Sequence, residues 1–132
     1  LLQCTSPLRR ENDISDTVQL VKTGEYDSAL SCSEDHSFYW EIEPESAVPV
    51  NYDPVERKRR QDISPRYQEN GSIYVVTEEI LRERHCRLGG KIGIHEMPKE
   101  MSFEIDTPED YRIVEAIAKN IEFAAKNYGG AS

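Results

Sequence analysis

Apolar spacing predicts one helix near the start of the chain, and a capping residue predicts a second, shorter one farther along. Ile14 and Val18 recur at helical spacing and predict a helix over residues 13–23. A second, shorter helix is predicted over residues 77–84, and the paired glycines at 89–90 are expected to break it.

A third helix, near the end of the chain, has the clearest pattern. Thr107 fits the N-cap, Pro108 fits the first helical position, and Asp110 completes a box-like capping pattern. The predicted helix carries an apolar stripe at helical spacing, formed by Tyr111, Val114, Ile117, Ala118, Ile121 and Ala125. Gly129 and Gly130 are expected to end it.

Short apolar or alternating runs predict strands between these helices, at residues 28–33, 38–42, 72–76, 91–97 and 102–106. Leu1 and Leu2 have the character of the tail of a buried strand, so we expect the chain to be the latter part of a longer protein. Residues 44–71 hold four of the seven prolines and show little periodicity, which predicts a long functional loop with short strand pieces. Strands that alternate with helices place the chain in the α/β class.

Composition narrows the classes of partner and compartment. The 132 residues include 25 acidic and 16 basic side chains, and the formal net charge of −9 argues against nucleic-acid binding. No run of about 18 apolar residues occurs, so no membrane span is predicted. The three cysteines lack the spacing of a zinc site, and their odd number argues against a disulfide framework. We therefore expect a protein of a reducing compartment, the cytoplasm.

Two segments have side chains that could bind an anion. Gln3, Thr5, Ser6 and Arg9 follow a predicted strand end, where ligands often bind in α/β sheets. The basic run at residues 57–60 could bind one small anionic ligand through its guanidinium groups. The alternatives are that the hydroxyls satisfy turn backbone and that the basic run is a solvated loop.

Two further segments could hold a metal ion or a sugar. Glu104 and Asp106 stand two residues apart in a predicted strand, so their carboxylates would face the same side. Two oxygen ligands, completed by phosphate oxygens and waters, suit Mg²⁺. Gly71 would let the backbone approach a ligand closely, and Asn70 could bind a sugar hydroxyl. The alternatives are a helix cap at Asp106, a solvent-facing Glu104 and a simple turn at Gly71.

In order along the chain, five motifs resemble the acylneuraminate cytidylyltransferases, also called CMP-sialic acid synthetases. The motifs are Leu1-Leu2-Gln3-x-Thr5-Ser6-Pro7-Leu8-Arg9, Arg59-Arg60-Gln61-Asp62, Glu69-Asn70-Gly71-Ser72-Ile73-Tyr74, Gly90-Lys91-Ile92-Gly93 and Glu104-Ile105-Asp106-Thr107-x-Glu109-Asp110. The resemblance covers nearly the whole chain, and an ordered set of motifs is more specific than any one of them.

The resemblance implies a nucleotide-diphospho-sugar transferase-like, or Rossmann-like, fold with a mostly parallel sheet. It implies transfer of CMP from CTP to the anomeric hydroxyl of a sialic-type nine-carbon 2-keto sugar acid, N-acetylneuraminate or legionaminate. Mg²⁺ would be the cofactor and pyrophosphate the second product. In the family a projecting segment forms a homodimer, and here it would include residues 36–66 and 84–100.

The same resemblance assigns roles to individual residues. Arg60 and Asp106 would be catalytic, and Asp106 with Glu104 would hold Mg²⁺. The residues that bind the substrates would be Gln3, Thr5, Ser6, Arg9, Arg57, Gln61, Asn70 and Tyr74. Attack on the α-phosphate needs aligned reactants and neutralised charge rather than a covalent protein intermediate.

Three features depart from the family pattern. Cys4 stands where the family usually has Pro, and Glu104 where many members have Asp. The family's N-terminal loop that cradles the CTP phosphates has no counterpart in these residues, so we expect the chain alone not to bind CTP normally. The alternative functions are a non-catalytic dimerisation or sugar-acid-binding module and a regulatory sugar-acid sensor.

Overall fold

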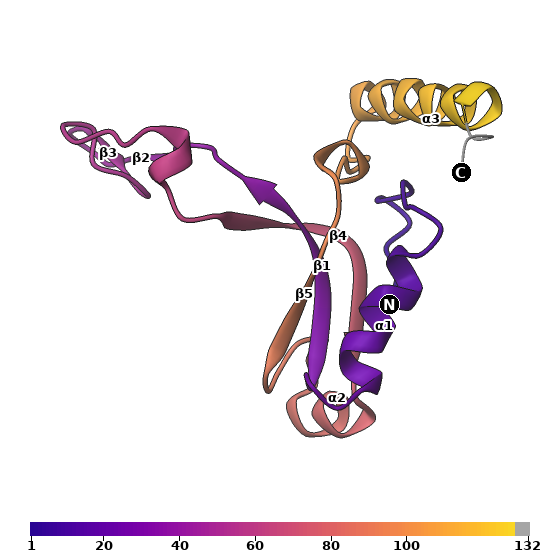
Figure 1. Cartoon of the computed structure of the whole chain (residues 1–132). Helices are drawn as coiled ribbons and strands as arrows, with labels where there is room; N and C mark the ends of the chain where they lie inside the picture. Colours follow the sequence, from indigo (N-terminus) through magenta and orange to yellow (C-terminus); the bar gives the residue numbers. More distant parts are fainter. Residues whose placement is uncertain (129–132) are drawn as a thin grey trace.

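The computed structural model describes residues 1–128, in which helices and strands are interspersed along the chain (Figure 1). In order, the elements are α1 (Asp13–Lys22), β1 (Ser28–Asp35), β2 (Trp40–Ile42), β3 (Ala47–Pro49), η1 (Arg60–Asp62), β4 (Arg66–Val76), α2 (Glu78–Arg84), β5 (Ile92–Glu96), η2 (Lys99–Met101) and α3 (Pro108–Tyr128). The α/β class is therefore confirmed. Among the helices described, none has the length and apolar character that a membrane crossing requires.

The main sheet has three strands in the order β4-β1-β5, with β1 in the centre. β1 runs antiparallel to β4 and parallel to β5, so the described sheet is mixed rather than mostly parallel as predicted. The chain leaves β1 and returns directly to its neighbour as β4, which makes this pair antiparallel. α1 lies against all three strands (Figure 1). The central position of β1 explains its small side chains, because Ser28, Ala29 and Ser31 are all buried.

A bulge interrupts the pairing of β1 with β4. The register shifts between Leu30 and Cys32, opposite the segment of β4 that contains Gly71. Gly71 has φ +66°, a conformation that residues with a Cβ rarely adopt. Asn70 and Ser72, on either side of this glycine, are both buried. The bulge therefore turns a polar stretch of β4 into the interior.

Residues 36–65, which we call the arm, project from the end of the sheet between β1 and β4 (Figure 1). β2 and β3 pair as an antiparallel hairpin within the arm. Tyr52 packs on Phe38 with ring centroids 4.3 Å apart, and on Trp40 at 5.8 Å. These aromatic contacts give the arm a small packed centre of its own.

Ile73 and Tyr74 are neighbours in β4, so their side chains point to opposite faces and join different apolar clusters. The cluster of Ile73 contains Leu8, Met97, Met101 and Val114. The cluster of Tyr74 contains Leu30 and Cys32, with Leu88 packed against it. The first cluster also attaches α3, because Ile117 and Ala118 pack against it beside Val114.

The three predicted helices are confirmed, although their packing and ends differ in detail. In α1 the buried residues are Asp13 and Thr17, whereas Ile14 and Val18 are exposed. α2 begins at the predicted cap, Thr77, but its end precedes the glycine pair. His85, at φ 50°, occupies the left-handed position that closes this helix.

The strand predicted at residues 102–106 is wrong. η2 precedes this segment, and its backbone makes one long-range bond, from Ile105 N to Thr5 O at 2.8 Å. A strand needs a neighbour along its length, and no strand in residues 1–128 lies beside this segment. Leu1 and Leu2, predicted as part of a buried strand, hydrogen-bond to β4 but are 67% and 47% exposed.

One predicted strand and one predicted projecting segment differ from the structure. β4 extends over Arg66–Val76 because its first residues pair with the end of β1, which the sequence treats as loop. Of the predicted projecting segments, residues 36–65 form the arm, whereas residues 84–100 contain β5 of the main sheet. The predicted helix end at Gly129 and Gly130, and the side chain of Ala125, lie outside what the structure describes.

Candidate functional site

The loop before α1 meets β4 at Gly71. A Cβ at this position would overlap the Oε1 atoms of Glu104 and Gln3, so both side chains pass directly over the glycine. Ser6 Oγ lies 3.1 Å from Glu104 Oε1 and 3.2 Å from Asn70 O, two acceptors for its one proton. The structure thus brings together Gln3, Ser6 and Glu104, three side chains predicted to belong to a site.

Arg9 fastens this loop to β4 rather than facing outward. Its Nη2 donates to the backbone oxygens of Gln3 at 3.1 Å and Ser72 at 3.2 Å. Arg9 Nε and Ser72 Oγ are buried without a hydrogen-bond partner among the described residues. Thr5 contributes its backbone oxygen to the bond with Ile105.

Asn70 lies beneath this surface, with 2% of its area exposed. Its Oδ1 accepts hydrogen bonds from Ser31 Oγ at 2.7 Å and Ser72 N at 3.2 Å. Its Nδ2 donates to Ser102 Oγ at 3.0 Å. The buried amide therefore links β1, the bulge and the segment that leads to Glu104.

Tyr74 lies in the other cluster, away from this network. Its hydroxyl donates to Glu69 Oε1, and the Arg87 guanidinium lies 4.2 Å from the centre of its ring. Burial, assisted by the nearby Glu69 carboxylate, raises the pKa of Tyr74 to about 12. Tyr74 is therefore a neutral hydrogen-bond donor throughout the physiological pH range.

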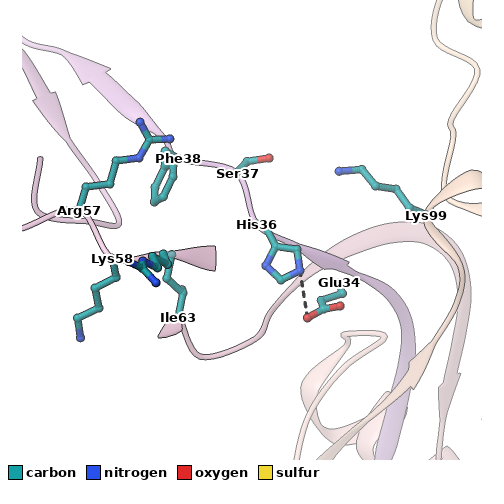
Figure 2. A pocket seen from close by; sticks show the side chains of 9 residues that line it. Glu34, His36, Ser37, Phe38, Arg57, Lys58, Ile63 and Lys99 are labelled. Atoms are coloured by element: carbon teal, nitrogen blue, oxygen red, sulfur yellow. Dashed lines mark ion pairs between the residues drawn. The ribbon is translucent and has the colours of Figure 1, made fainter. Parts of the chain in front are cut away.

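The basic residues of the arm line a hollow of about 590 Å³ between the arm and the sheet (Figure 2). We call it the basic hollow; it is lined by Glu34, His36, Ser37, Phe38, Arg57, Lys58, Arg59, Ile63 and Lys99. Arg57 stacks over the ring of Phe38 at 4.6 Å. Glu34, the one acidic residue of the lining, lies 3.2 Å from His36 Nε2. Cations therefore dominate this surface, although the chain as a whole is acidic.

The two remaining residues of the basic motif lie in η1. Gln61 is exposed, and the side chain of Arg60 is outside what the structure describes. A second, smaller hollow of about 240 Å³ adjoins the basic one; it is lined by Ser33, Gln68, Lys99, Ser102, Phe103 and Glu104. Lys99 belongs to both linings, so the arm cations and the Glu104 carboxylate flank adjoining spaces.

The two predicted metal ligands lie on irregular backbone, so the same-face argument for their convergence does not apply. Glu104 and Asp106 are both exposed. The amide of Asp106 donates to Asp110 Oδ2 at 3.2 Å, as part of the start of α3. Within residues 1–128 no group of three His, Cys, Asp or Glu side chains could hold a metal ion. The pair fits Mg²⁺ only as two hard oxygen donors that phosphate oxygens and water would complete.

Comparison with known proteins shows which of these features belong together. The chain is 36% identical over 118 residues to N-acylneuraminate cytidylyltransferase A of Danio rerio, across 86% of this chain and 27% of that protein. It is 28% identical over 114 residues to the N-acylneuraminate cytidylyltransferase of Streptococcus agalactiae serotype V, across 84% of this chain and 28% of that protein. The chain is a relative of the N-acylneuraminate cytidylyltransferases.

The relationship to the N-acylneuraminate cytidylyltransferases covers a limited share of those proteins. The chain spans slightly more than a quarter of the length of the two relatives just named. The post-translational flagellin modification protein B of Campylobacter coli is 23% identical over 129 residues, across 96% of this chain and 55% of that protein. No family model matches the sequence.

Three residues of the site were not predicted in this N-acylneuraminate cytidylyltransferase relative. These are His36, Asp35 and Lys99, none of which belongs to the five motifs quoted from the sequence. A usable signal exists for the first two, because they stand at the carboxyl end of a strand, where α/β sheets bind ligands. Lys99 has no local signal, since only the folding of the chain brings η2 beside the arm.

Proposed function

We propose that the chain provides the sugar-acid-binding part of a cytidylyltransferase. The enzyme would transfer CMP from CTP to the anomeric hydroxyl of N-acetylneuraminate or legionaminate and release pyrophosphate. One observation carries the proposal. In a chain related to N-acylneuraminate cytidylyltransferases, the basic hollow lies beside the smaller hollow that Glu104 lines.

The basic hollow would take the carboxylate of the sugar acid. Arg57 is suited to this role because its guanidinium is held over Phe38 and can pair bidentately with a carboxylate. Gln61 and Arg60, in η1, would extend the same cationic wall toward the nucleotide. Neutralising the charge of both reactants would lower the barrier to their approach.

The surface over Gly71 would place the sugar hydroxyls. Gln3 presents an amide there and Thr5 borders it, whereas Ser6 is fully buried and would hold Glu104 in place from beneath. Arg9 and Asn70 would act from beneath, because their side chains brace the loop and the bulge. Tyr74 lies on the other face of β4 with its hydroxyl bound to Glu69, so it would support this part of the sheet rather than touch the sugar acid.

Glu104 and Asp106 would hold Mg²⁺ together with the phosphates. When bound, the ion would act as a Lewis acid that neutralises charge on the α-phosphate. Asp106 would also lie near the attacking hydroxyl and could accept its proton. Arg60 would stabilise the charge that develops on the phosphoryl oxygens.

The test is a pyrophosphate-release assay on the full-length product of the gene, with CTP, Mg²⁺ and either sugar acid. We expect release with one of the acids, strong loss with Asp106→Asn and a raised sugar-acid KM with Arg57→Ala. Lys119→Ala, on an exposed face of α3, is the matched control. Absence of release with both acids, measured beside an active relative, would overturn the enzymatic proposal.

A direct titration separates catalysis from binding. Calorimetry with N-acetylneuraminate measures whether the protein binds the acid when no CTP is present. Binding without turnover would support a sugar-acid-binding module in place of the enzyme. A protein that neither binds nor turns over the acid has neither function.

A further inference from the structure

Lys99 holds an unusual place between the two hollows. It lines the basic hollow with the arm residues and the smaller hollow with Glu104. Figure 2 shows it across the basic hollow from Arg57, with His36 and Ser37 between them. A ligand that spans both hollows must pass this ammonium group.

The backbone of Lys99 is fixed by its neighbours. Lys99 begins η2, and Met97 and Met101 on either side of it are 1% and 8% exposed. The amide of Met101 donates to Pro98 O at 2.9 Å, which closes the turn. The side chain therefore extends from a rigid base, although 66% of it is exposed.

Asp35 lies near the other end of this side chain and attracts it. Its carboxylate is 7% exposed and lies 3.9 Å from Lys99 Nζ. The same carboxylate accepts hydrogen bonds from Tyr39 OH at 2.6 Å and from Ser37 Oγ at 2.7 Å. The bond from Tyr39 holds the pKa of Asp35 below its usual value, against the effect of burial, so the group is an anion.

The geometry leaves the ammonium available. A separation of 3.9 Å is too long for a hydrogen bond, so Asp35 attracts Lys99 without using its donors. The Asp35 oxygens are occupied by Ser37 and Tyr39 of the arm. Lys99 Nζ makes no hydrogen bond with any described residue, and its side chain, which is largely exposed, lines both hollows.

We propose that Lys99 contacts the substrate, and that Asp35 positions it between the arm and Glu104. The group it binds is a cluster of anionic oxygens, either the carboxylate of the acid or a phosphate of the nucleotide. This inference rests on the proposed cytidylyltransferase function and adds a residue to its binding surface. It also gives Asp35 a role, as a positioning residue that sets both the root of the arm and the ammonium.

The experiment compares Lys99→Met with Lys119→Met in the full-length protein. The two lysines are matched, since their side chains are 66% and 69% exposed and each lies beside a carboxylate. Pyrophosphate release is measured against the concentration of N-acetylneuraminate, of legionaminate and of CTP. We expect Lys99→Met to raise one KM by about tenfold or more, as loss of a charged hydrogen bond does. Lys99→Arg should restore most of the loss, and Lys119→Met should stay within about twofold of wild type.

The substrate whose KM rises identifies the anion. A rise for the sugar acid assigns the carboxylate, and a rise for CTP assigns a phosphate; either supports the inference. Unchanged KM values in an active Lys99→Met protein would overturn it and leave the proposed function intact. If wild type is inactive, the proposed function fails, and titration of Trp40 fluorescence with N-acetylneuraminate and with inorganic pyrophosphate decides the inference. Equal affinity of wild type and Lys99→Met for both probes, or no binding of either, would then overturn it.

Asp35→Asn tests the positioning role in both backgrounds. In the wild-type background it should raise the same KM with kcat little changed. In the Lys99→Met background it should add no further rise, because the residue it positions is gone. A purely structural role for Asp35 would instead lower the melting temperature and kcat equally in both backgrounds, which would overturn this part of the inference.

Discussion

The three cysteines differ in how much of each thiol the solvent can reach. Cys4 and Cys86 are exposed, whereas Cys32 is buried in β1. Burial, with a smaller contribution from Glu69, raises the pKa of the Cys32 thiol to about 11. A thiol that is both buried and protonated reacts slowly, because the thiolate is the nucleophile.

We therefore predict that Ellman's reagent titrates two thiols in the native protein at pH 8 and the third only after denaturation. The variant Cys32→Ala should show two thiols under both conditions. Rapid reaction of three thiols in the native state would contradict the packing of β1.

Asp13 is a buried carboxylate held by two basic side chains. It is 1% exposed and lies 2.9 Å from His95 Nε2 of β5, while Arg10 Nε donates to it at 2.9 Å. Burial would raise the pKa of Asp13, but the bonds from Arg10 and His95 outweigh it and hold this pKa below its usual value. The group thus ties the loop that carries Gln3 and Ser6 to the far edge of the sheet.

Because the pKa of Asp13 is lowered in the native protein, the free energy of unfolding depends on pH. A carboxyl with a lowered native pKa stabilises the fold above its unfolded pKa, near 3.8, and this contribution is lost as pH falls through the native value. We predict that Asp13→Asn costs about 2 kcal/mol at neutral pH and less below about pH 3. Urea unfolding at both pH values measures this, with the exposed Asp16→Asn as control. An equal loss at both pH values would contradict it.

At the scale of an element, the bulge in β4 lets two side chains of the candidate site pass directly over Gly71. Both Gly71 and Gly24 have positive φ, but a Cβ at Gly24 would meet nothing within 4 Å. A Cβ at Gly71 would meet the ends of two flexible side chains, Gln3 and Glu104, which can move aside at little cost. The two glycines should therefore differ in function more than in stability.

We predict that Gly71→Ala and Gly24→Ala each cost about 1 kcal/mol, the strain of a left-handed residue with a Cβ. Gly71→Ala should also displace Gln3 and Glu104 and lower pyrophosphate release about tenfold or more, as misplaced reacting groups do. Gly24→Ala should keep wild-type turnover once corrected for stability. Equal turnover in both variants would show that the close approach at Gly71 has no part in catalysis.

The elements that could be predicted from sequence are those with local causes. The start of α3 depends on Thr107 and Asp110, which hydrogen-bond to each other across one turn. Whether paired strands run parallel or antiparallel depends on which strands become neighbours. The same is true of the wrong strand prediction at residues 102–106. No local sequence pattern contains that information.

The residues of the candidate site also fall into two groups: those with a local sequence signal and those that only folding brings together. The basic run containing Arg57 is visible in the sequence, and the structure places Arg57, Lys58 and Arg59 in the lining of the basic hollow. The pairing of Asp35 with Lys99 joins residues 64 positions apart and exists only after folding. Asn70 is buried, so it would brace the bulge and not touch a ligand. Its burial likewise follows from the bulge and not from its neighbours in sequence.

At the scale of the whole molecule, the arm projects from the sheet and carries exposed apolar side chains (Figure 1). Ile42 and Val55 are 92% and 90% exposed, and Trp40 is half exposed on the same projection. Apolar side chains gathered on a projecting segment favour association with another surface. A second copy of the chain is the partner expected from the family resemblance.

We predict that the protein sediments as a dimer and that Ile42→Glu shifts it toward monomer by at least about tenfold in Kd, since a buried charge would face the apolar contact. Analytical ultracentrifugation over a range of concentrations measures the shift. Glu41→Gln, the neighbouring exposed position, is the control. A dimer constant that Ile42→Glu leaves unchanged would place the interface elsewhere.

The arm leaves and rejoins the sheet at one rung of the ladder, because Asp35 and Arg66 are register partners. The two ends of the arm are therefore held side by side by the sheet. Doubling the length of such a loop costs only about 0.6 kcal/mol of closure entropy. Insertions, deletions or exchange of residues 36–65 can therefore accumulate over evolutionary time without disturbing strand register. A lineage could remodel the cations and the apolar tip while inheriting the same three-stranded scaffold.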